Sequence, residues 1–370
     1  MKRIIILCET MSGGVRRHLV DLISNIDREN YEIHMIYSSN RSDKVFEDSS
    51  RELEGKIKFY DIKEMKRKIS FKDDIKSLIQ IIKIIRQVKP HLIHCHSSKA
   101  GLLGRVSGSL CRINVIYTPH AYFAQNDSLA KRKRYFFTLV ERFLSKGTKK
   151  TINVSYGEQK FALQHKIVKK NKSTVIYNGI SDLQSCRSKE DINNRFIVGT
   201  LARVDDQKNP FSFIKVGEAL IEKYPNMDFV YVGDGELLEE ARKYVSNKKI
   251  ADRIKFIGFS GNIVEELQRF NIYLSTALYE GLPYAVIEAL ALKKPLVLSD
   301  VTGNNELVIP EYNGFLFPVN QEKIAIEKIE LLYNNREAYE KYSTNSYKLF
   351  EQKFNLESMI EKIQYVYDSL

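Results

Sequence analysis

Short, unbroken apolar runs alternate with longer amphipathic segments along most of the chain, and this alternation restricts the possible folds more than any other feature. The first apolar run, 3–7, is followed by a turn at 12–14 and then by apolar residues at helical spacing from 15 to 26. A run without polar alternation is typical of a strand that is covered on both faces. The pattern therefore predicts parallel sheets with helices on both sides.

The alternation runs through the first half of the chain, stops at a polar stretch, 181–194, and then begins again. In open α/β sheets, ligands bind outside the carboxyl ends of the strands. We therefore expect two doubly wound, Rossmann-like domains, 1–182 and 183–350, whose strand ends face a central cleft. Further strands are predicted at 31–38, 56–62, 91–97, 114–120, 151–155, 174–180, 195–203, 228–235, 253–260, 272–278 and 294–300, and a long helix at 71–90.

The composition excludes several classes of protein. The chain has 370 residues, 43% of them hydrophobic, which is enough for two cores, and it contains no apolar run of 18 residues that could span a membrane. The apolar segment before Glu9 is too short for a signal peptide. The four cysteines have scattered spacings, which indicate neither a disulfide framework nor a zinc ribbon. We expect a cytoplasmic protein with reduced thiols.

The positive charge is concentrated in the first half. Residues 1–180 hold 35 Lys and Arg against 17 Asp and Glu, a balance of +18, whereas residues 181–370 hold 23 against 29, a balance of −6. The two add up to the net charge of +12. Such a basic half is typical of proteins that bind nucleic acid, an anionic membrane surface or an acidic substrate.

Two glutamates interrupt the mostly apolar stretch 279–295. Pro283 is suited to the start of a helix, so Glu280 is expected in the loop before it and Glu288 inside the helix, about 7.5 Å beyond Pro283 along the axis. The amino end of a helix attracts anions. A nucleotide-sugar, with a phosphate between two sets of hydroxyls, would suit both acids. Alternatively, both acids are solvated or paired with Lys293 or Lys294.

Two other segments have the residues of an anion site. Arg203 and Lys208 follow a predicted strand, and such a pair is well suited to a diphosphate leaving group. Gly13 and Gly14 follow the first strand and allow backbone N–H groups to approach an anion. The dinucleotide spacing G-x-G-x-x-G and the P-loop lysine motif are absent from the sequence.

Taken in order, these motifs resemble the retaining glycosyltransferases of family four, which have the GT-B fold, over nearly the whole chain. The matching motifs are G-G-V-x-x-H from Gly13, H-x-H-S at 94–97, T-P-H at 118–120, Y-N-G at 177–179, R-x4-K at 203–208, V-G-D-G at 232–235, E-x7-E at 280–288 and D-x-x-G-N-x-E at 300–306. For the last segment, 351–370, we expect a helix that crosses back to the N-terminal domain.

The resemblance implies a role for individual residues. Glu288 would bind the ribose of a UDP-sugar and Glu280 the hydroxyls of its sugar, while His120 would lie beside the reacting carbon. The base would be contacted by Gly258 and Phe259. The diphosphate would be held by Arg203, Lys208, Gly13, Gly14, Gly281 and Leu282. Retention of configuration would follow from front-face attack.

The sequence predicts no cofactor and no metal ion. Asp234-Gly235-Glu236 is the nearest approach to a metal-binding D-x-D pair, but it is interpreted as a turn between a strand and a helix. His94 and His96 share one strand face, near His91 and Cys95, yet no third ligand stands at zinc spacing.

The segment 128–150 suggests where the acceptor is found. It is a predicted helix with one apolar face and many basic residues, a composition that is typical of a helix lying on an anionic membrane. The acceptor would then be a lipid-linked glycan of surface-polysaccharide synthesis, and the protein would be peripheral on the inner face of the cell membrane. A helix packed on the core with a solvated basic rim is the alternative. The apolar face consists of Phe136, Leu139, Val140, Phe143 and Leu144, and the basic residues are Lys131, Arg132, Lys133, Arg134, Arg142, Lys146, Lys149 and Lys150.

Two other functions are compatible with parts of the sequence. A nucleotide-sugar epimerase can have the same fold, but it needs no acceptor, and the E-x7-E arrangement argues against it. A protein that binds nucleic acid would display aromatic residues within its basic patch. Here Phe136, Phe137 and Phe143 are expected to be packed inside, which argues against nucleic acid as a partner.

Overall fold

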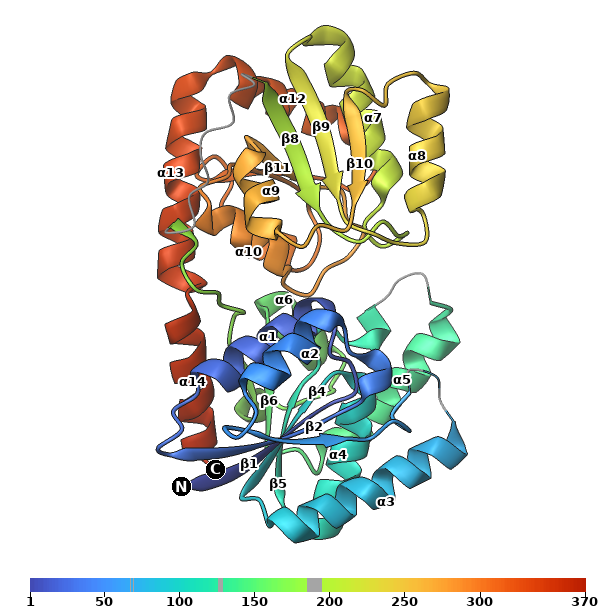
Figure 1. Ribbon diagram of the computed structural model, residues 1–370, viewed down its shortest axis with the longest axis vertical. Helices are drawn as coiled ribbons and strands as arrows, with labels where there is room; N and C mark the ends of the chain where they lie inside the picture. The colour runs from blue at the N-terminus through green and yellow to red at the C-terminus, as the bar shows by residue number, and fades with distance from the viewer. Residues whose placement is uncertain (67, 69, 126–128, 185–194) are drawn as a thin grey trace. The chain divides into compact units, whose positions relative to one another are not determined.

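The computed structural model describes residues 1–66, 68, 70–125, 129–184 and 195–370, and it divides the chain into two compact units (Figure 1). Unit 1 comprises Met1–Asn178 and Leu356–Leu370, and unit 2 comprises Gly179–Asn355. These limits differ by a few residues from the expected ones at 182 and 350. Most of the polar stretch interpreted as a linker, 185–194, lies outside the described residues, and so does Cys186.

Unit 1 is built on a parallel sheet of seven strands in the order β3-β2-β1-β4-β5-β6-β7. The register places Ile6 of β1 beside His94 of β4, and His96, the last residue of β4, beside Thr118 of β5. The strands are β1 (Lys2–Cys8), β2 (Tyr31–Tyr37), β3 (Lys58–Asp61), β4 (Leu92–His96), β5 (Asn114–Thr118), β6 (Lys150–Asn153) and β7 (Ser173–Val175).

Helices cover both faces of this sheet, as the unbroken apolar strands require. One core layer joins β1 to α1 (Gly13–Asn25), α2 (Lys44–Glu52) and α14 (Leu356–Asp368). The other joins β1 and β4 to α3 (Phe71–Val88), α4 (Ser98–Cys111) and α6 (Tyr156–Gln164). Successive residues of β1 point into opposite layers, so both faces of the strand are buried. The remaining elements of the unit are α5 (Lys131–Ser145) and the short 3-10 helices Ser39–Arg41, Phe123–Gln125 and Lys170–Lys172.

The last helix of the chain, α14, is part of unit 1 and contacts α1 (Figure 1). Its Tyr367 is fully buried, and the phenol oxygen lies 2.7 Å from Nδ1 of His94 on β4. Lys2 at the beginning of the chain forms an ion pair of 3.2 Å with Asp368. The chain therefore begins and ends in the same unit.

Unit 2 contains a parallel sheet of six strands in the order β10-β9-β8-β11-β12-β13. The buried residues of α7, α8 and α12 form one core layer with the sheet. On the sheet's other face, the ring of Phe270 lies against Gly199 of β8, where any side chain would collide with it. The strands are β8 (Phe196–Leu201), β9 (Met227–Val232), β10 (Ile254–Gly258), β11 (Ile272–Ser275), β12 (Leu296–Ser299) and β13 (Gly314–Phe317), and the helices are α7 (Pro210–Lys223), α8 (Leu238–Asn247), α9 (Ile263–Arg269), α10 (Tyr284–Ala291), α11 (Asn304–Leu307), α12 (Glu322–Asn334) and α13 (Arg336–Lys353).

The sequence predicted the two parallel sheets but not every element. The strand expected at 174–180 ends at Val175, and β13 was not predicted. The helix expected within 128–150 covers Lys131–Ser145. No helix in the described part of the chain is long and apolar enough to cross a membrane.

Candidate functional site

The loop after β8 holds the first candidate residues of unit 2 and is fixed from several sides. The phenol of Tyr231 donates a hydrogen bond of 2.9 Å to the carbonyl of Arg203, and the hydroxyl of Thr276 donates one of 3.0 Å to the carbonyl of Lys208. Arg203 forms an ion pair of 2.6 Å with Asp205 and donates a hydrogen bond of 2.9 Å to Gln207. The backbone is therefore held firmly, while the guanidinium group of Arg203, about two-thirds exposed, remains accessible.

Lys208 and Glu280 form an ion pair at the carboxyl edge of the sheet. The side chain of Glu280 is 8% exposed and that of Lys208 is 16% exposed. Glu280 is thus neither solvated nor paired with Lys293 or Lys294, so the alternative expectation for this acid was wrong. Removing either partner would leave a mostly buried charge without its counterion, which is costly.

Glu288 lies in the middle of α10 and is 4% exposed. Burial raises the pKa of the neighbouring Tyr273 above its ordinary value, and the charges of Glu280 and Glu288 raise it further. Both acids therefore act on the same buried tyrosine of β11. The helix itself begins one residue later than expected, with Pro283 at the position before its first turn.

Two glycines allow close approaches of the backbone at this edge. A side chain at Gly233 would overlap the carbonyl of Ala202, and one at Gly303 would overlap the carbonyl of Gly281. Both glycines have positive φ, as does Gly258 at the end of β10. Phe259, which follows Gly258, is 75% exposed and presents its ring to solvent. An exposed aromatic ring at the edge where strands end can stack on a planar ligand such as a nucleobase.

The segment Asp234-Gly235-Glu236 lies in the turn between β9 and α8, as predicted. A carboxylate oxygen of Asp234 accepts a hydrogen bond of 2.7 Å from the N–H of Gly235. This bond caps the turn locally.

In unit 1, the turn after β1 leads directly into α1. Gly13 has a φ of 59° and, like Gly14, is exposed. A side chain added at Gly13 would meet no atom within 4 Å. The first turn of α1 contains no acidic residue. The backbone N–H groups at this helix end are therefore open to an anion.

Four histidines of unit 1 gather behind this turn. Nδ1 of His96 lies 3.0 Å from Nε2 of His120, and the rings of His94 and His96 lie 4.0 Å apart, on one strand face as expected. The ring of His18 from α1 lies 4.8 Å from that of His120. Burial lowers the pKa of His18 to about 4 and lowers the pKa values of the other three well below the ordinary range. All four rings are therefore neutral at pH 7.

His120, the predicted catalytic residue, sits in an unusual backbone turn. His120 and Ala121 have φ values of 55° and 85°, which are costly for residues with a side chain. The carboxylate of Glu158 holds the turn, because it accepts hydrogen bonds of 2.6 Å from the N–H of Ala121 and 2.7 Å from that of Val154. Sequence analysis missed Glu158. The pattern Ser155-x-x-Glu158 is a capping-box signature that could have revealed it, and Ser155 does cap α6.

Glu9 at the end of β1 is a second acid that sequence analysis missed. It is 5% exposed, and its carboxylate accepts hydrogen bonds from the hydroxyl of Ser97 and, at 3.2 Å, from the N–H of Ala100 in the first turn of α4. Arg41 pairs with it at 3.2 Å. Glu9 thus ties the end of β1 to the end of β4, where His96 lies.

The helix α5 does not bury the aromatic residues that were expected to be packed. Phe136 is 58% exposed and Phe143 is 72% exposed, so the expectation that they lie inside was wrong. Only Thr138 and Leu144 of this helix are buried. The periodicity marked an apolar face correctly, but it could not indicate whether that face meets protein or solvent. Phe137 is half-buried.

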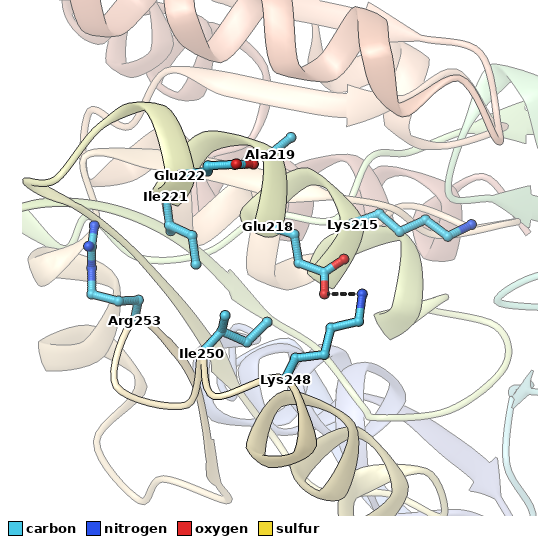
Figure 2. Close-up of a pocket in the computed structure, with 8 residues that line it drawn as sticks. All are labelled: Lys215, Glu218, Ala219, Ile221, Glu222, Lys248, Ile250 and Arg253. Atoms are coloured by element: carbon cyan, nitrogen blue, oxygen red, sulfur yellow. Dashed lines mark ion pairs between the residues drawn. The ribbon is translucent and has the colours of Figure 1, made fainter.

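A pocket in unit 2 lies away from these residues. Figure 2 shows Glu218 of α7 pointing toward Lys248, with which it forms an ion pair of 2.7 Å. Arg253, which also lines the pocket, directly precedes β10, so the pocket opens at the amino edge of the sheet rather than at the carboxyl edge. Its cations are therefore not those of the candidate site.

Comparison with known proteins bears on both units. Residues 12–182 match the family model described as Glycosyltransferase Family 4, and residues 184–349 match the model described as Glycosyl transferases group 1. The chain is 27% identical over 370 residues to the UDP-Gal:alpha-D-GlcNAc-diphosphoundecaprenol alpha-1,3-galactosyltransferase of Escherichia coli, with 96% of this chain and 93% of that protein covered. It is 24% identical to the capsular polysaccharide biosynthesis glycosyltransferase CapM of Staphylococcus aureus, with 95% and 96% covered.

Solved structures of similar fold point the same way. Anabaena Alr3699/HepE in complex with UDP and glucose superimposes with a TM-score of 0.83 at 18% identity, with both chains fully covered. The apo lipopolysaccharide outer core galactosyltransferase WaaB gives a TM-score of 0.75 at 15% identity, again with full coverage. These likenesses show the GT-B fold for this chain. The curated relatives, which are glycosyltransferases by name, favour neither an epimerase nor a nucleic-acid-binding protein.

We expect Glu158→Gln to lower the free energy of unfolding by about 1–3 kcal/mol, because the amide has one acceptor oxygen for two N–H groups and one of them loses its partner. Urea denaturation followed by circular dichroism measures the change. The control is Glu327→Gln on the exposed side of α12, which should be neutral. Equal stability of the two variants would contradict the role given to Glu158.

Proposed function

Because the chain belongs to the glycosyltransferases of family 4, we propose that it moves a sugar from a UDP-sugar to a lipid-linked glycan in the synthesis of a surface polysaccharide. The observation that carries the donor part is the mostly buried ion pair of Lys208 and Glu280 next to the amino end of α10. An acid and a base that pair with each other at the carboxyl edge of a parallel sheet are well placed to bind a ligand there. Each exchanges its contact with the other for a contact with the ligand.

Binding of the donor separates the two members of this pair. The diphosphate draws Lys208 away from Glu280 and also engages the exposed Arg203, since a dianion offers more charge than one carboxylate. The backbone N–H groups of Gly281 and Leu282 add to the diphosphate site, and that of Gly14 offers a further anion contact in unit 1. Glu280 then accepts hydrogen bonds from the sugar hydroxyls. A donor without a diphosphate cannot open the pair, which makes the site selective for nucleotide-sugars.

The nucleoside is held by three residues of the same unit. Glu288 accepts hydrogen bonds from the ribose hydroxyls, and burial in α10 fixes its position. The exposed ring of Phe259, after Gly258, stacks on the base. Uracil is supported by the UDP in the structure of Alr3699/HepE and by the UDP-Gal in the name of the E. coli relative.

The transfer itself requires stabilisation of the leaving diphosphate. Lys208 and Arg203 supply positive charge to it as the glycosidic bond breaks, so the reaction proceeds without a metal ion. The acceptor attacks from the face that the diphosphate leaves, and the anomeric configuration is retained. We assign the neutral ring of His120 to the reacting carbon, as the family resemblance implies; His120 lies in a turn where it and Ala121 have positive φ.

The acceptor is a glycan on a lipid diphosphate, and α5 brings the protein to the membrane that holds it. The exposed side of α5 combines Phe136 and Phe143 with the exposed cations 131–133. Its one acid, Glu141, pairs with Arg105 at 2.8 Å and accepts a hydrogen bond from Tyr117 on the inner side. The outward side is therefore cationic and aromatic, which is complementary to an anionic lipid surface.

Incubation of the protein with a panel of UDP-sugars and GDP-mannose tests the donor assignment. We expect UDP-sugars to raise the melting temperature, because they bind the folded state alone, and a matching UDP-sugar to be transferred to N-acetylglucosamine on undecaprenyl diphosphate. Proton NMR of the product identifies the anomer, and retention is expected. Absence of both stabilisation and transfer across the UDP-sugars would overturn the proposal.

Two variants separate binding from turnover in the same assay. Lys208→Gln should lower kcat by about 100-fold or more, as loss of an electrostatic stabiliser does. Glu288→Gln should weaken UDP binding by roughly tenfold or more in calorimetry, since a charge-assisted hydrogen bond is lost. Glu327→Gln is the control and should resemble the unaltered protein. Unchanged UDP affinity in Glu288→Gln would remove the ribose role.

Co-sedimentation with vesicles tests the membrane role of α5. Substitution of Lys131, Arg132 and Lys133 by Gln should weaken binding to vesicles containing phosphatidylglycerol by about 100-fold, because each cation contributes roughly 1 kcal/mol at an anionic surface. Arg134 is left in place, since its guanidinium group bonds the carbonyl of Ala124 at 3.0 Å.

The matched control removes three exposed cations from unit 2, Lys323, Lys341 and Lys348. This control should bind the same vesicles as the unaltered protein does, and vesicles of phosphatidylcholine alone should bind neither. Phe136→Ser with Phe143→Ser should weaken binding without a change in charge. If the α5 variant and the unit 2 control bound equally, the membrane role of this helix would be refuted.

A further inference from the structure

Three of the four clustered histidines come from separate segments and converge on one point. His18 lies on α1, His96 ends β4 and His120 follows β5. One ring nitrogen of each lies within 4.8 Å of those of the other two. Sequence analysis found no third ligand near His94 and His96, because His18 and His120 come close only through the pairing of the parallel strands and the packing of α1.

The donor set defines which ions fit. Three neutral imidazoles with no carboxylate among them suit zinc, cobalt, nickel or copper, whereas magnesium and calcium prefer oxygen. In a tetrahedral zinc site with bonds of 2.0–2.1 Å, two ligand nitrogens are about 3.3 Å apart. The nitrogens of His96 and His120 are already 3.0 Å apart. Only a small movement of the two rings is needed to bring these nitrogens to the spacing of two zinc ligands.

The surroundings of the three rings also suit an ion. His96 and His18 are buried, while His120 is half-buried and leaves a route for entry from solvent. With Nδ1 of His96 as the ligand, the proton of the ring is carried by Nε2, which is buried and has no hydrogen-bond partner among the described residues.

His94 is excluded from the set by its own partners. Its Nδ1 lies 2.7 Å from the hydroxyl of Tyr367, and its Nε2 lies 2.8 Å from that of Thr118. Both nitrogens are therefore engaged, and His94 supports the ring of His96 from behind. Three protein ligands leave the fourth position of a tetrahedral ion to water.

We propose that His18, His96 and His120 form a binding site for a divalent transition-metal ion of the zinc class, with water as the fourth ligand. A consequence, which rests on the proposed function, follows for the enzyme. Because His120 is both a ligand and the residue beside the reacting carbon, an ion bound here takes its nitrogen away from the substrate. Zinc then inhibits transfer, whereas magnesium has no effect.

Titration of the tag-free, full-length protein with Co²⁺ alone tests the site. We expect a visible absorption band typical of tetrahedral cobalt, saturation at one ion per chain, and displacement by Zn²⁺. His96→Gln and His120→Gln should each weaken binding by more than about 100-fold, beyond the 10–100-fold cost of losing an outer partner. The control is His91→Gln, an exposed histidine close to the cluster in sequence, which should bind as the unaltered protein does.

Circular dichroism of each variant shows whether it is folded. His120→Gln is the more secure test, because its half-buried side chain is easier to replace. The proposal is overturned if the unaltered protein binds no cobalt, or if both folded variants bind it as tightly as His91→Gln does. Since this titration contains neither nucleotide nor sugar, its failure leaves the proposed transfer reaction untouched, and a failed transfer assay leaves the metal site untouched.

Discussion

In a parallel sheet every strand delivers its carboxyl end to the same edge, and the candidate residues of this protein depend on that constraint. In unit 1, His96 ends β4, and Glu9 and His120 follow β1 and β5. In unit 2, Arg203 and Glu280 follow β8 and β11. Apolar strands buried on both faces keep the sheets rigid, so the polar residues can stay in the short loops. Each loop is then fixed by hydrogen bonds to its neighbours, as Tyr231 and Thr276 fix the loop that carries Lys208.

The two candidate clusters, one in each unit, handle buried polarity in different ways. In unit 2 the mostly buried Glu280 is paired with Lys208. In unit 1 burial suppresses the charge of the histidines, whose lowered pKa values keep them neutral. A charged pair can exchange its internal partner for a charged ligand, and neutral rings can offer lone pairs to a sugar hydroxyl or a metal ion. The chemistry proposed for each unit follows from this difference.

Most of the fold could be predicted because its strands are apolar without interruption. Strands such as β1 and β4 are recognisable from sequence alone, whereas β13, with four residues and no clear helical pattern before it, is not. The acids 280 and 288 were recognisable because charge inside a mostly apolar stretch is unusual. The partner of each acid could not be predicted from the sequence. Glu280 pairs with a lysine 72 residues away, and only the packing of β11 beside β8 brings the two together.

The turn at His120 shows how unit 1 sustains a conformation that its own residues disfavour. A positive φ at two consecutive residues with side chains costs of order 1–3 kcal/mol each, and glycine or asparagine would lower that cost. The chain has histidine and alanine there instead, and it offsets the cost with the carboxylate of Glu158, which is fully buried and accepts two backbone N–H groups. Substitution of His120 by glycine would relieve strain but remove the ring. The strain is therefore the consequence of placing a histidine at the end of β5, where a glycine would adopt the same turn at lower cost.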